Sequence, residues 1–313
     1  FWLAPFCEPG GALPVAVSSA IAYRPRYSTS LSAASPSASN SPSNASHDKP
    51  ATMPPARISS PTGSCTPLAS PPTALPEGKW RLVDDFSDEF DGATVNLSKW
   101  NTSYRSWGAW TWDPATVAVV APGMLKISMA YEAHTCTAGG TCFYKSGIAR
   151  SRKPEGIAFG YFEARIKGAS RWPGVCPAFW AWRHADDYWT ELDFVEMLEN
   201  KVTPRDIDFT SHLFPPSVPA HVSNSTHLNF SWDPRDDFHT YGMEWNASTL
   251  TWWVDGTVVK TEPAGIFAKG HPMDVALSFG LRPPLRDAPN ATGFPTSFLV
   301  DYVRVYQREE EAK

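Results

Sequence analysis

Three carboxylates fall within six residues in the segment Glu191-Leu192-Asp193-Phe194-Val195-Glu196. Side chains alternate between the two faces of a strand, so Glu191 and Asp193 share one face. Strict alternation would place the third acid at position 195, whereas the sequence has it at 196. One extra residue, a β-bulge, would return Glu196 to the acidic face. Because a row of acids on an apolar strand is costly unless the charges have a task, this segment is a candidate site for acid, base or nucleophilic chemistry.

The composition excludes several classes of function. The 313 residues include 27 basic and 32 acidic side chains, and the net charge of −5 argues against nucleic acid and against an anionic membrane as partners. No apolar run approaches the roughly 18 residues that span a membrane. The aromatic content of 13%, with 14 Trp, suits a large β core or a sugar-binding surface.

The character of the sequence changes along the chain. Residues 1–26 are moderately apolar, and we expect the remnant of a secretion signal or another N-terminal segment. Residues 27–77 are rich in Ser, Pro, Ala and Thr, so we expect a disordered linker that buries no core. Aromatic and branched residues return in residues 78–308, which we expect to form one folded domain, and residues 309–313 are a charged tail.

Two features favour an oxidising, extracellular or cell-wall location. Cys136 and Cys142 flank a turn-rich loop and would close it as a disulfide, with two free thiols as the alternative. No Cys/His cluster has the spacing of a metal site. Seven Asn-x-Ser/Thr sequons favour a secreted glycoprotein, and they begin at Asn44, Asn96, Asn101, Asn224, Asn229, Asn246 and Asn290.

The elements that must hold the acids are strands. Alternating segments recur through the domain, and Asp255-Gly256 between two of them is a strong hairpin signal. Long amphipathic helix patterns are missing. Many strands separated by turn signals predict an all-β two-sheet sandwich or a barrel. The clearest alternating segments are 123–129, 160–167, 250–254 and 298–306.

The acidic segment resembles the E-x-D-x-x-E signature of glycoside hydrolase family 16. Four further segments resemble pieces of that family in the same order, across about residues 86–306. These are Gly160-Tyr161-Phe162-Glu163-Ala164-Arg165, Pro177-Ala178-Phe179-Trp180, the run from Phe238 through Val254-Asp255-Gly256, and Val300-Asp301-Tyr302-Val303-Arg304-Val305. The resemblance implies a jelly roll similar to concanavalin A, with a concave cleft for a polysaccharide.

The resemblance also implies a mechanism. Glu191 would be the nucleophile, Glu196 the general acid/base and Asp193 an assisting carboxylate that hydrogen-bonds the nucleophile. Retaining hydrolysis needs carboxyl groups about 5–5.5 Å apart, whereas five steps of a straight strand span about 16 Å. A bulge and a concave strand reduce that separation, so the mechanism itself requires the bulge. The alternative is a solvated acidic strand face.

Several residues are candidates for substrate binding. Trp107, Trp112 and Trp182 are expected to stack on sugar rings, with core packing as the alternative for each. His212 falls on the expected next strand and could contact the sugar beside the cleaved bond, unless it is a structural histidine. Other candidates are Arg150 and Arg183, for bidentate recognition of sulfate, and Glu163, either in the cleft or paired with Arg165.

The resemblance leaves the substrate open. The run Ser146 to Ser151 and the closing strand look closest to the branch that cuts algal galactans such as agarose, porphyran and carrageenan. β-1,3-Glucanases come next, although their usual Trp-Pro and Gly before the first catalytic Glu are missing. A wall transglycosylase, and a carbohydrate-binding protein without turnover, also remain open. No cofactor is expected; a structural calcium is common in the family, but no acidic cluster assigns its ligands. We expect a monomer.

Overall fold

The computed structural model describes residues 73–121, 123–137, 139–184, 189–199, 202–214 and 221–309. The expected N-terminal segment 1–26, the linker up to residue 72, the sequon at Asn44 and the tail from residue 310 lie outside these residues. Within them the helical elements are three short 3-10 turns, η1 (Asp84–Phe86), η2 (Pro114–Thr116) and η3 (Gly265–Lys269). No helix among the described residues is long and apolar enough to cross a membrane.

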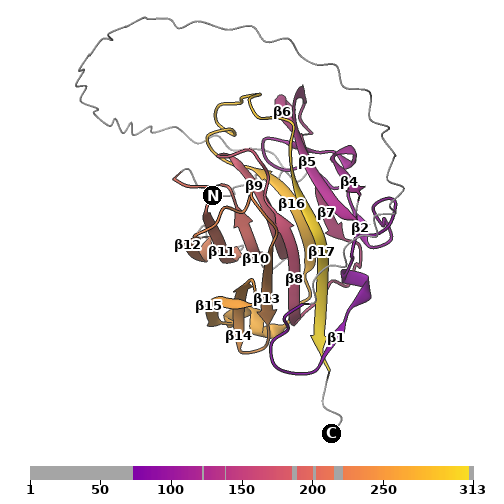
Figure 1. Ribbon diagram of the computed structural model, residues 1–313, viewed down its shortest axis with the longest axis vertical. Coiled ribbons are helices and arrows are strands. Elements are labelled where there is room, and N and C mark those ends of the chain that lie inside the picture. Colours follow the sequence, from indigo (N-terminus) through magenta and orange to yellow (C-terminus); the bar gives the residue numbers. More distant parts are fainter. Residues whose placement is uncertain are drawn as a thin grey trace, which may run out of the picture. The chain divides into compact units, whose positions relative to one another are not determined.

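Strands make up most of the domain (Figure 1). Their bounds are β1 Trp80–Leu82, β2 Trp100–Asn101, β3 Thr111–Trp112, β4 Val117–Val120, β5 Met124–Thr135, β6 Thr141–Ser146, β7 Ile148–Ser151, β8 Gly160–Lys167, β9 Val175–His184, β10 Trp189–Met197, β11 Asp206–Phe214, β12 Val222–Asn229, β13 His239–Trp245, β14 Thr249–Val254, β15 Thr257–Pro263, β16 Asp274–Leu281 and β17 Thr296–Arg308.

These strands form two sheets, which confirms the predicted all-β sandwich. The ten-stranded sheet has the order β15-β14-β13-β8-β17-β5-β6-β3, with β1 paired to β17 and β4 to β5. The seven-stranded sheet has the order β12-β11-β10-β9-β16-β7-β2. The strand that carries the three acids, β10, therefore lies inside its sheet between β9 and β11.

Aromatic side chains join the two sheets. Phe162 of β8 and Phe194 of β10 have ring centroids 5.2 Å apart, and Phe279 of β16 lies 5.3 Å from Phe298 of β17. All four are at most 1% exposed, and each such side chain contributes about 1.5–3 kcal/mol by leaving water. Because Phe194 points into this core, the acids on the opposite side of β10 must point away from the ten-stranded sheet.

The predicted hairpin is also confirmed. Asp255 and Gly256 both have positive φ, at 47° and 74°, and they join β14 to β15 with Val254 opposite Thr257. Two consecutive residues with positive φ are characteristic of a type I′ turn, whose twist matches that of the flanking strands.

Candidate active site

The predicted bulge lies in β10. Relative to β11, the register shifts between Asp193 and Glu196, and relative to β9 it shifts between Asp193 and Val195. The partners of the three acids on β9 are Trp182, Trp180 and Ala178 in turn. The three partners on β9 are evenly spaced, two residues apart, whereas Asp193 and Glu196 on β10 are three residues apart. The extra residue therefore brings Glu196 back to the face that carries Glu191 and Asp193, which we call the acid face.

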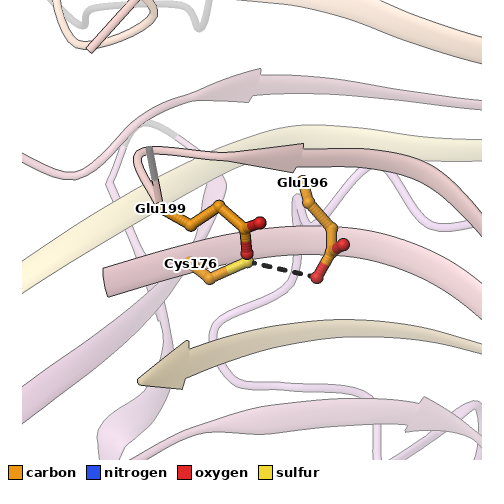
Figure 2. A group of neighbouring side chains, drawn as sticks. All are labelled: Cys176, Glu196 and Glu199. Carbon is orange, nitrogen blue, oxygen red and sulfur yellow. Dashed lines mark hydrogen bonds between the residues drawn. The ribbon is translucent and has the colours of Figure 1, made fainter. Parts of the chain in front are cut away.

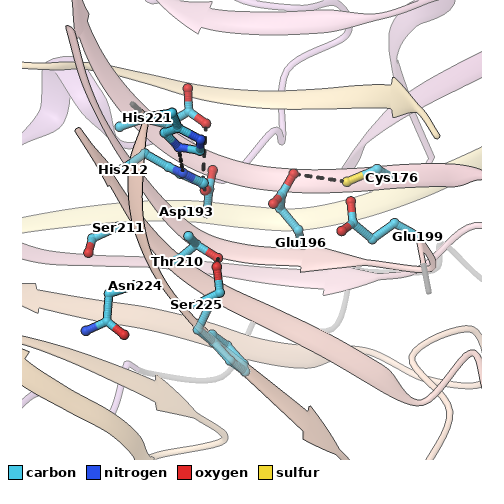
Figure 3. Close-up of polar contacts among 12 residues, drawn as sticks. Cys176, Asp193, Glu196, Glu199, Thr210, Ser211, His212, His221, Asn224 and Ser225 are labelled. Atoms are coloured by element: carbon cyan, nitrogen blue, oxygen red, sulfur yellow. Dashed lines mark hydrogen bonds and ion pairs between the residues drawn. The ribbon is translucent and has the colours of Figure 1, made fainter. Parts of the chain in front are cut away.

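The strands beside β10 add polar residues to the acid face. On β11, His212 lies opposite Glu191, Thr210 opposite Asp193 and Asp208 opposite Glu196. Thr210 donates a hydrogen bond to Ser225 of β12 at 3.1 Å, and Figure 3 shows this pair beside the row of acids. The acid face thus presents hydroxyl, imidazole and carboxylate groups in neighbouring rows.

His212 is the basic neighbour of two of the acids. Its Nε2 lies 2.9 Å from Asp193 Oδ2 and 3.9 Å from Glu191 Oε1. The contact with Asp193 lies within ion-pair distance and is ionic when His212 is protonated, whereas Oδ2 has no aligned hydrogen-bond partner. Its Nδ1 lies 2.7 Å from Nε2 of His221 (Figure 3). Asp193 therefore interacts with His212, and no Asp193–Glu191 hydrogen bond is found among the described residues.

The electrostatics of the acid row favour protonation. Burial, followed by repulsion from Asp193 and Glu196, raises the pKa of Glu191 well above its usual value, although Arg282 opposes this. Burial and repulsion from Asp193 and Glu199 likewise raise the pKa of Glu196. The Glu191 and Glu196 side chains are only 13% and 15% exposed. A raised pKa suits a proton donor, whereas a nucleophile must be ionised, so at a working pH one of the two coupled acids holds a proton while the other is ionised.

Sequence reasoning missed three residues around Glu196. Cys176 of β9 donates from its thiol to Glu196 Oε1 at 3.4 Å. Arg282, just after β16, donates from Nη2 to the same Oε1 and from Nε to Glu199 Oε2 at 2.6 Å. Arg282 lies about 90 residues from the acids in sequence, so only the pairing of β16 with β9 brings it close. Sequence reasoning could have pointed to Cys176 and Glu199. Cys176 lies just before the Pro-Ala-Phe-Trp segment, and Glu199 lies shortly after the acidic segment.

A further carboxyl group, that of Asp208 on β11, interacts with Glu199. Burial raises the pKa of Asp208 to about 6, while its hydrogen bond from His227 acts in the opposite direction. Burial would also raise the pKa of Glu199, but the charge and hydrogen bond of Arg282 outweigh it, so the pKa of Glu199 lies below its usual value.

Two groups of side chains have the donor atoms of a metal site, with those atoms within 4.8 Å of one another. They are Glu191, Asp193 and His212, and Cys176, Glu196 and Glu199. Each mixes carboxylates with a nitrogen or sulfur donor, unlike the six to eight oxygens that calcium prefers. The calcium expected from the resemblance remains a prediction.

The predicted aromatic residues gather beside the acids. Trp182 and Trp180 are stacked with centroids 4.3 Å apart. Trp107 contacts Trp180 at 6.4 Å and Trp112 at 5.2 Å. Because Trp182 lies opposite Glu191 and Trp180 opposite Asp193, these rings continue the acid face toward the segment around Trp112.

Arg150 belongs to the same group. It lies above the Tyr104 and Trp182 rings, at 4.9 Å and 5.5 Å from their centroids. Its Nη2 donates to Asp274 Oδ2 at 2.6 Å. The structure thus places a planar cation against aromatic faces, with its charge paired to Asp274.

Two predicted site residues lie elsewhere. Arg183 pairs with Thr190, one residue from the Trp182–Glu191 pair, so it projects from the opposite face of β9. Glu163 is 2% exposed and accepts hydrogen bonds from Tyr161 and Tyr302 of the ten-stranded sheet, at 2.9 Å and 2.8 Å. The expectation that Glu163 points into the cleft is wrong, because its neighbour Phe162 faces the core and alternation turns Glu163 away from the acid face. Its alternative partner Arg165 pairs with Asp301 instead.

The predicted disulfide between Cys136 and Cys142 is confirmed, with Cα atoms 5.1 Å apart. It links the residue after β5 to the second residue of β6, and so closes the short loop between these two paired strands. Of the other cysteines, Cys7 and Cys65 lie outside the described residues, and Cys176 is a buried free thiol.

Comparison with known proteins gives consistent matches. A family profile described as "Beta-porphyranase A-D, GH16 domain" matches residues 80–308. The chain is 36% identical over 275 residues to the kappa-carrageenase of Pseudoalteromonas carrageenovora, which covers 75% of this chain and 67% of that protein. It is 24% identical over 258 residues to glucan endo-1,3-beta-glucosidase A1 of Niallia circulans, covering 72% of this chain but only 38% of that protein.

A solved structure agrees with these matches. The kappa-carrageenase of Pseudoalteromonas carrageenovora, crystallised with an oligotetrasaccharide of kappa-carrageenan, superimposes with a TM-score of 0.68 at 32% identity. The superposition covers 77% of this chain and 99% of the carrageenase chain.

Proposed function

Since this chain belongs to glycoside hydrolase family 16, we propose that it is a retaining endo-hydrolase of a β-linked algal galactan of the agarose, porphyran or carrageenan type. One observation carries this proposal: the bulge in β10 brings Glu191, Asp193 and Glu196 to one face, among neighbours that raise the pKa of both glutamates.

The three carboxylates divide the work in two steps. Glu191 attacks the anomeric carbon while the bond between that carbon and the leaving oxygen breaks. Glu196 donates a proton to the leaving oxygen. The covalent glycosyl-enzyme is then opened by water, whose proton passes to Glu196 as Glu191 departs. Asp193 assists by its charge, which helps Glu196 to hold its proton until the leaving oxygen takes it, and by its contact with His212 at 2.9 Å. This chemistry uses carboxyl groups alone and needs no cofactor.

The choice of a galactan rests on the relatives and on the aromatic group. The profile match is to porphyranases and a relative at 36% identity is a kappa-carrageenase. Trp107 is partly exposed and offers an apolar ring for a sugar face, whereas Trp112 and Trp182 are only 5% and 6% exposed and would each contribute a ring edge. Arg150 supplies a cation among these rings, and His212 lies next to the nucleophile. These five side chains are the proposed subsite residues.

The setting of the enzyme follows from the same features. A disulfide and a polysaccharide substrate fit a protein that acts outside the cell or in a cell wall. We propose a secreted monomer in which the domain from about residue 78 to residue 308 carries the activity and the Ser/Pro-rich linker precedes it.

The test compares the full chain with Glu191→Gln, which keeps the shape of the side chain and removes the nucleophile. Both are incubated with agarose, porphyran, carrageenan, laminarin and lichenan, and new reducing ends are measured. We expect release from a galactan by the unmodified chain, and a loss of at least about 10³-fold in the variant.

The other outcomes are informative. Release from laminarin alone would move the enzyme to the β-1,3-glucanases, as the similarity to the Niallia circulans protein suggests. Transfer products without new reducing ends would identify a transglycosylase. Binding without any turnover would leave a carbohydrate-binding protein and contradict the proposal.

A further inference from the structure

A second group of side chains meets the proposed acid/base at one end of the acid row. Figure 2 shows the Cys176 thiol close to the Glu196 and Glu199 carboxylates. Cys176 comes from β9, Glu199 follows the end of β10, and Arg282 follows the end of β16. The thiol is buried, with 1% of Cys176 exposed, and the Arg282 side chain is 14% exposed.

This group already contains a cation without a metal ion. Its thiol and two carboxylates have the separations of a cation site, but the Arg282 guanidinium donates to both carboxylates. A guanidinium carries a permanent positive charge and five donors. It takes the place that a cation would fill, so the group serves Glu196 rather than a metal.

The two oxygens of Glu196 have different surroundings. Oε1 accepts hydrogen bonds from the Cys176 thiol and from Arg282 Nη2. Among the described residues, Oε2 accepts no hydrogen bond. A carboxylic acid keeps its proton on the oxygen that is not already engaged by donors, because a second hydrogen on an accepting oxygen would be repelled. A general acid must carry its proton on the oxygen that faces the leaving group.

The thiol is suited to remain a donor. Burial raises the pKa of Cys176 well above its usual value; the charge of Arg282 opposes this, while repulsion from Glu196 and Glu199 adds to it. The thiol therefore keeps its hydrogen throughout the pH range in which carboxyl groups titrate. A hydroxyl or amide at this position would hydrate more readily, whereas a thiol tolerates an apolar strand environment.

We propose that Cys176 and Glu199 are positioning residues for Glu196, one through its thiol and the other through the shared guanidinium of Arg282, and that they leave Oε2 to carry the catalytic proton. This inference rests on the proposed function, because it takes Glu196 as the acid/base.

The two residues act on Glu196 with opposite sign. The Cys176 hydrogen bond lowers the pKa of Glu196, while the negative charge of Glu199 raises it. Glu199 also engages the Arg282 Nε, so a neutral residue at position 199 would remove the second carboxylate that competes with Glu196 for the guanidinium. Removal of the thiol should therefore raise the pKa of the acid, and neutralisation of Glu199 should lower it.

The experiment measures kcat/KM against pH for the full chain and its variants, on the galactan that the unmodified enzyme cleaves. The alkaline limb of this profile reports loss of the proton from the acid. We expect Cys176→Ala to move the alkaline limb upward by about 0.5–1 pH unit and Glu199→Gln to move it downward by about as much. Cys176→Ser keeps a donor and should restore the original limb.

Val175→Ala is the matched control. Val175 is the neighbour of Cys176 on β9, is fully buried and points to the core, so its truncation weakens packing without touching Glu196. We expect its alkaline limb to match that of the unmodified chain. Limbs that stay in place in both Cys176→Ala and Glu199→Gln, or that move in the same direction, overturn the inference.

Glu196→Gln separates this inference from the proposed function. If this variant keeps full activity, Glu196 is not the acid and the proposed mechanism fails. If it is inactive while the Cys176 and Glu199 variants titrate like the unmodified chain, the mechanism stands and only the positioning roles are lost.

Discussion

The crowding of acids on β10 opposes folding while it serves catalysis. Burial and repulsion from Asp193 raise the pKa of Glu191, which means that the folded chain holds this proton more tightly than the unfolded chain does. For a carboxyl group with a raised pKa, stability is highest at low pH and is lost as the pH rises from the unfolded toward the folded pKa. At neutral pH the charge of Glu191 therefore destabilises the domain.

We predict that Glu191→Gln abolishes activity and raises the melting temperature at pH 7. Each kcal/mol of relieved repulsion should raise Tm by about 2–4 °C in a domain of this size. The gain should shrink as the pH falls toward 4, because Glu191 is then neutral in both states. Thermal melts across pH measure this. Glu77→Gln changes the same charge at an exposed position, and an equal gain there would contradict the explanation.

His212 should act on the other limb of the pH profile. When protonated, it favours the ionised forms of Asp193 and Glu191, at 2.9 Å and 3.9 Å. We predict that His212→Ala raises the pKa of the nucleophile, so the acid limb of kcat/KM moves upward by about 1 pH unit. His239→Ala is the control, because His239 pairs with Asp255 at the hairpin of the other sheet. An acid limb that remains in place would show that His212 does not set the pKa of the nucleophile.

At the scale of strands, the bulge was predictable because it followed from a conflict between spacing and chemistry. Three acids at 191, 193 and 196 fit one face only if a residue is skipped, and the register confirms this. Strand periodicity and the Asp255-Gly256 turn likewise follow from local sequence.

The residues that sequence reasoning misplaced depend on contacts between distant strands. Side chains alternate along β8 as the sequence predicts, but local sequence does not say whether Glu163 lies on the face that packs into the core or on the opposite face. Arg282 reaches Glu196 only because β16 pairs with β9. Arg183 differs from Trp182 by one position, and that single step decides which face it occupies.

Deletion of Val195 tests the bulge directly. Without it, Glu196 would follow Phe194 directly, and strict alternation would place Glu196 on the acid face without a bulge. We predict that the deletion variant keeps activity, because the three acids still share one face, and that Tm falls through loss of the fully buried Val195 side chain. Val195→Ala keeps the chain length and the bulge, so it should lose only about 1–3 kcal/mol of packing and retain kcat. Activity assays and melts on both variants decide the matter, since a deletion variant that folds but has no activity would contradict this account of the bulge.

At the scale of the whole domain, the described chain begins before the first strand and is attached to the last one. Thr73 Oγ1 accepts hydrogen bonds from Arg304 and Tyr306 of β17, each at 3.3 Å. The Trp80 indole donates to the Pro76 carbonyl at 2.8 Å. Thr73 also hydrogen-bonds Glu163, so this segment helps to cover a buried carboxylate on the outer side of the ten-stranded sheet.

The sequence pattern placed the start of the domain at about residue 78, which would cut this attachment. Since buried polar groups that lose their partners cost about 1–3 kcal/mol each, we predict different outcomes for two truncations. A chain of residues 73–313 should match the full chain in kcat/KM and in Tm, whereas residues 78–313 should melt several degrees lower. Thr73→Val in the full chain keeps the backbone and removes the hydroxyl, so it should reproduce part of that loss. Equal melting temperatures for the two truncations would mean that residues 73–77 contribute nothing, and that the domain begins where composition alone suggested.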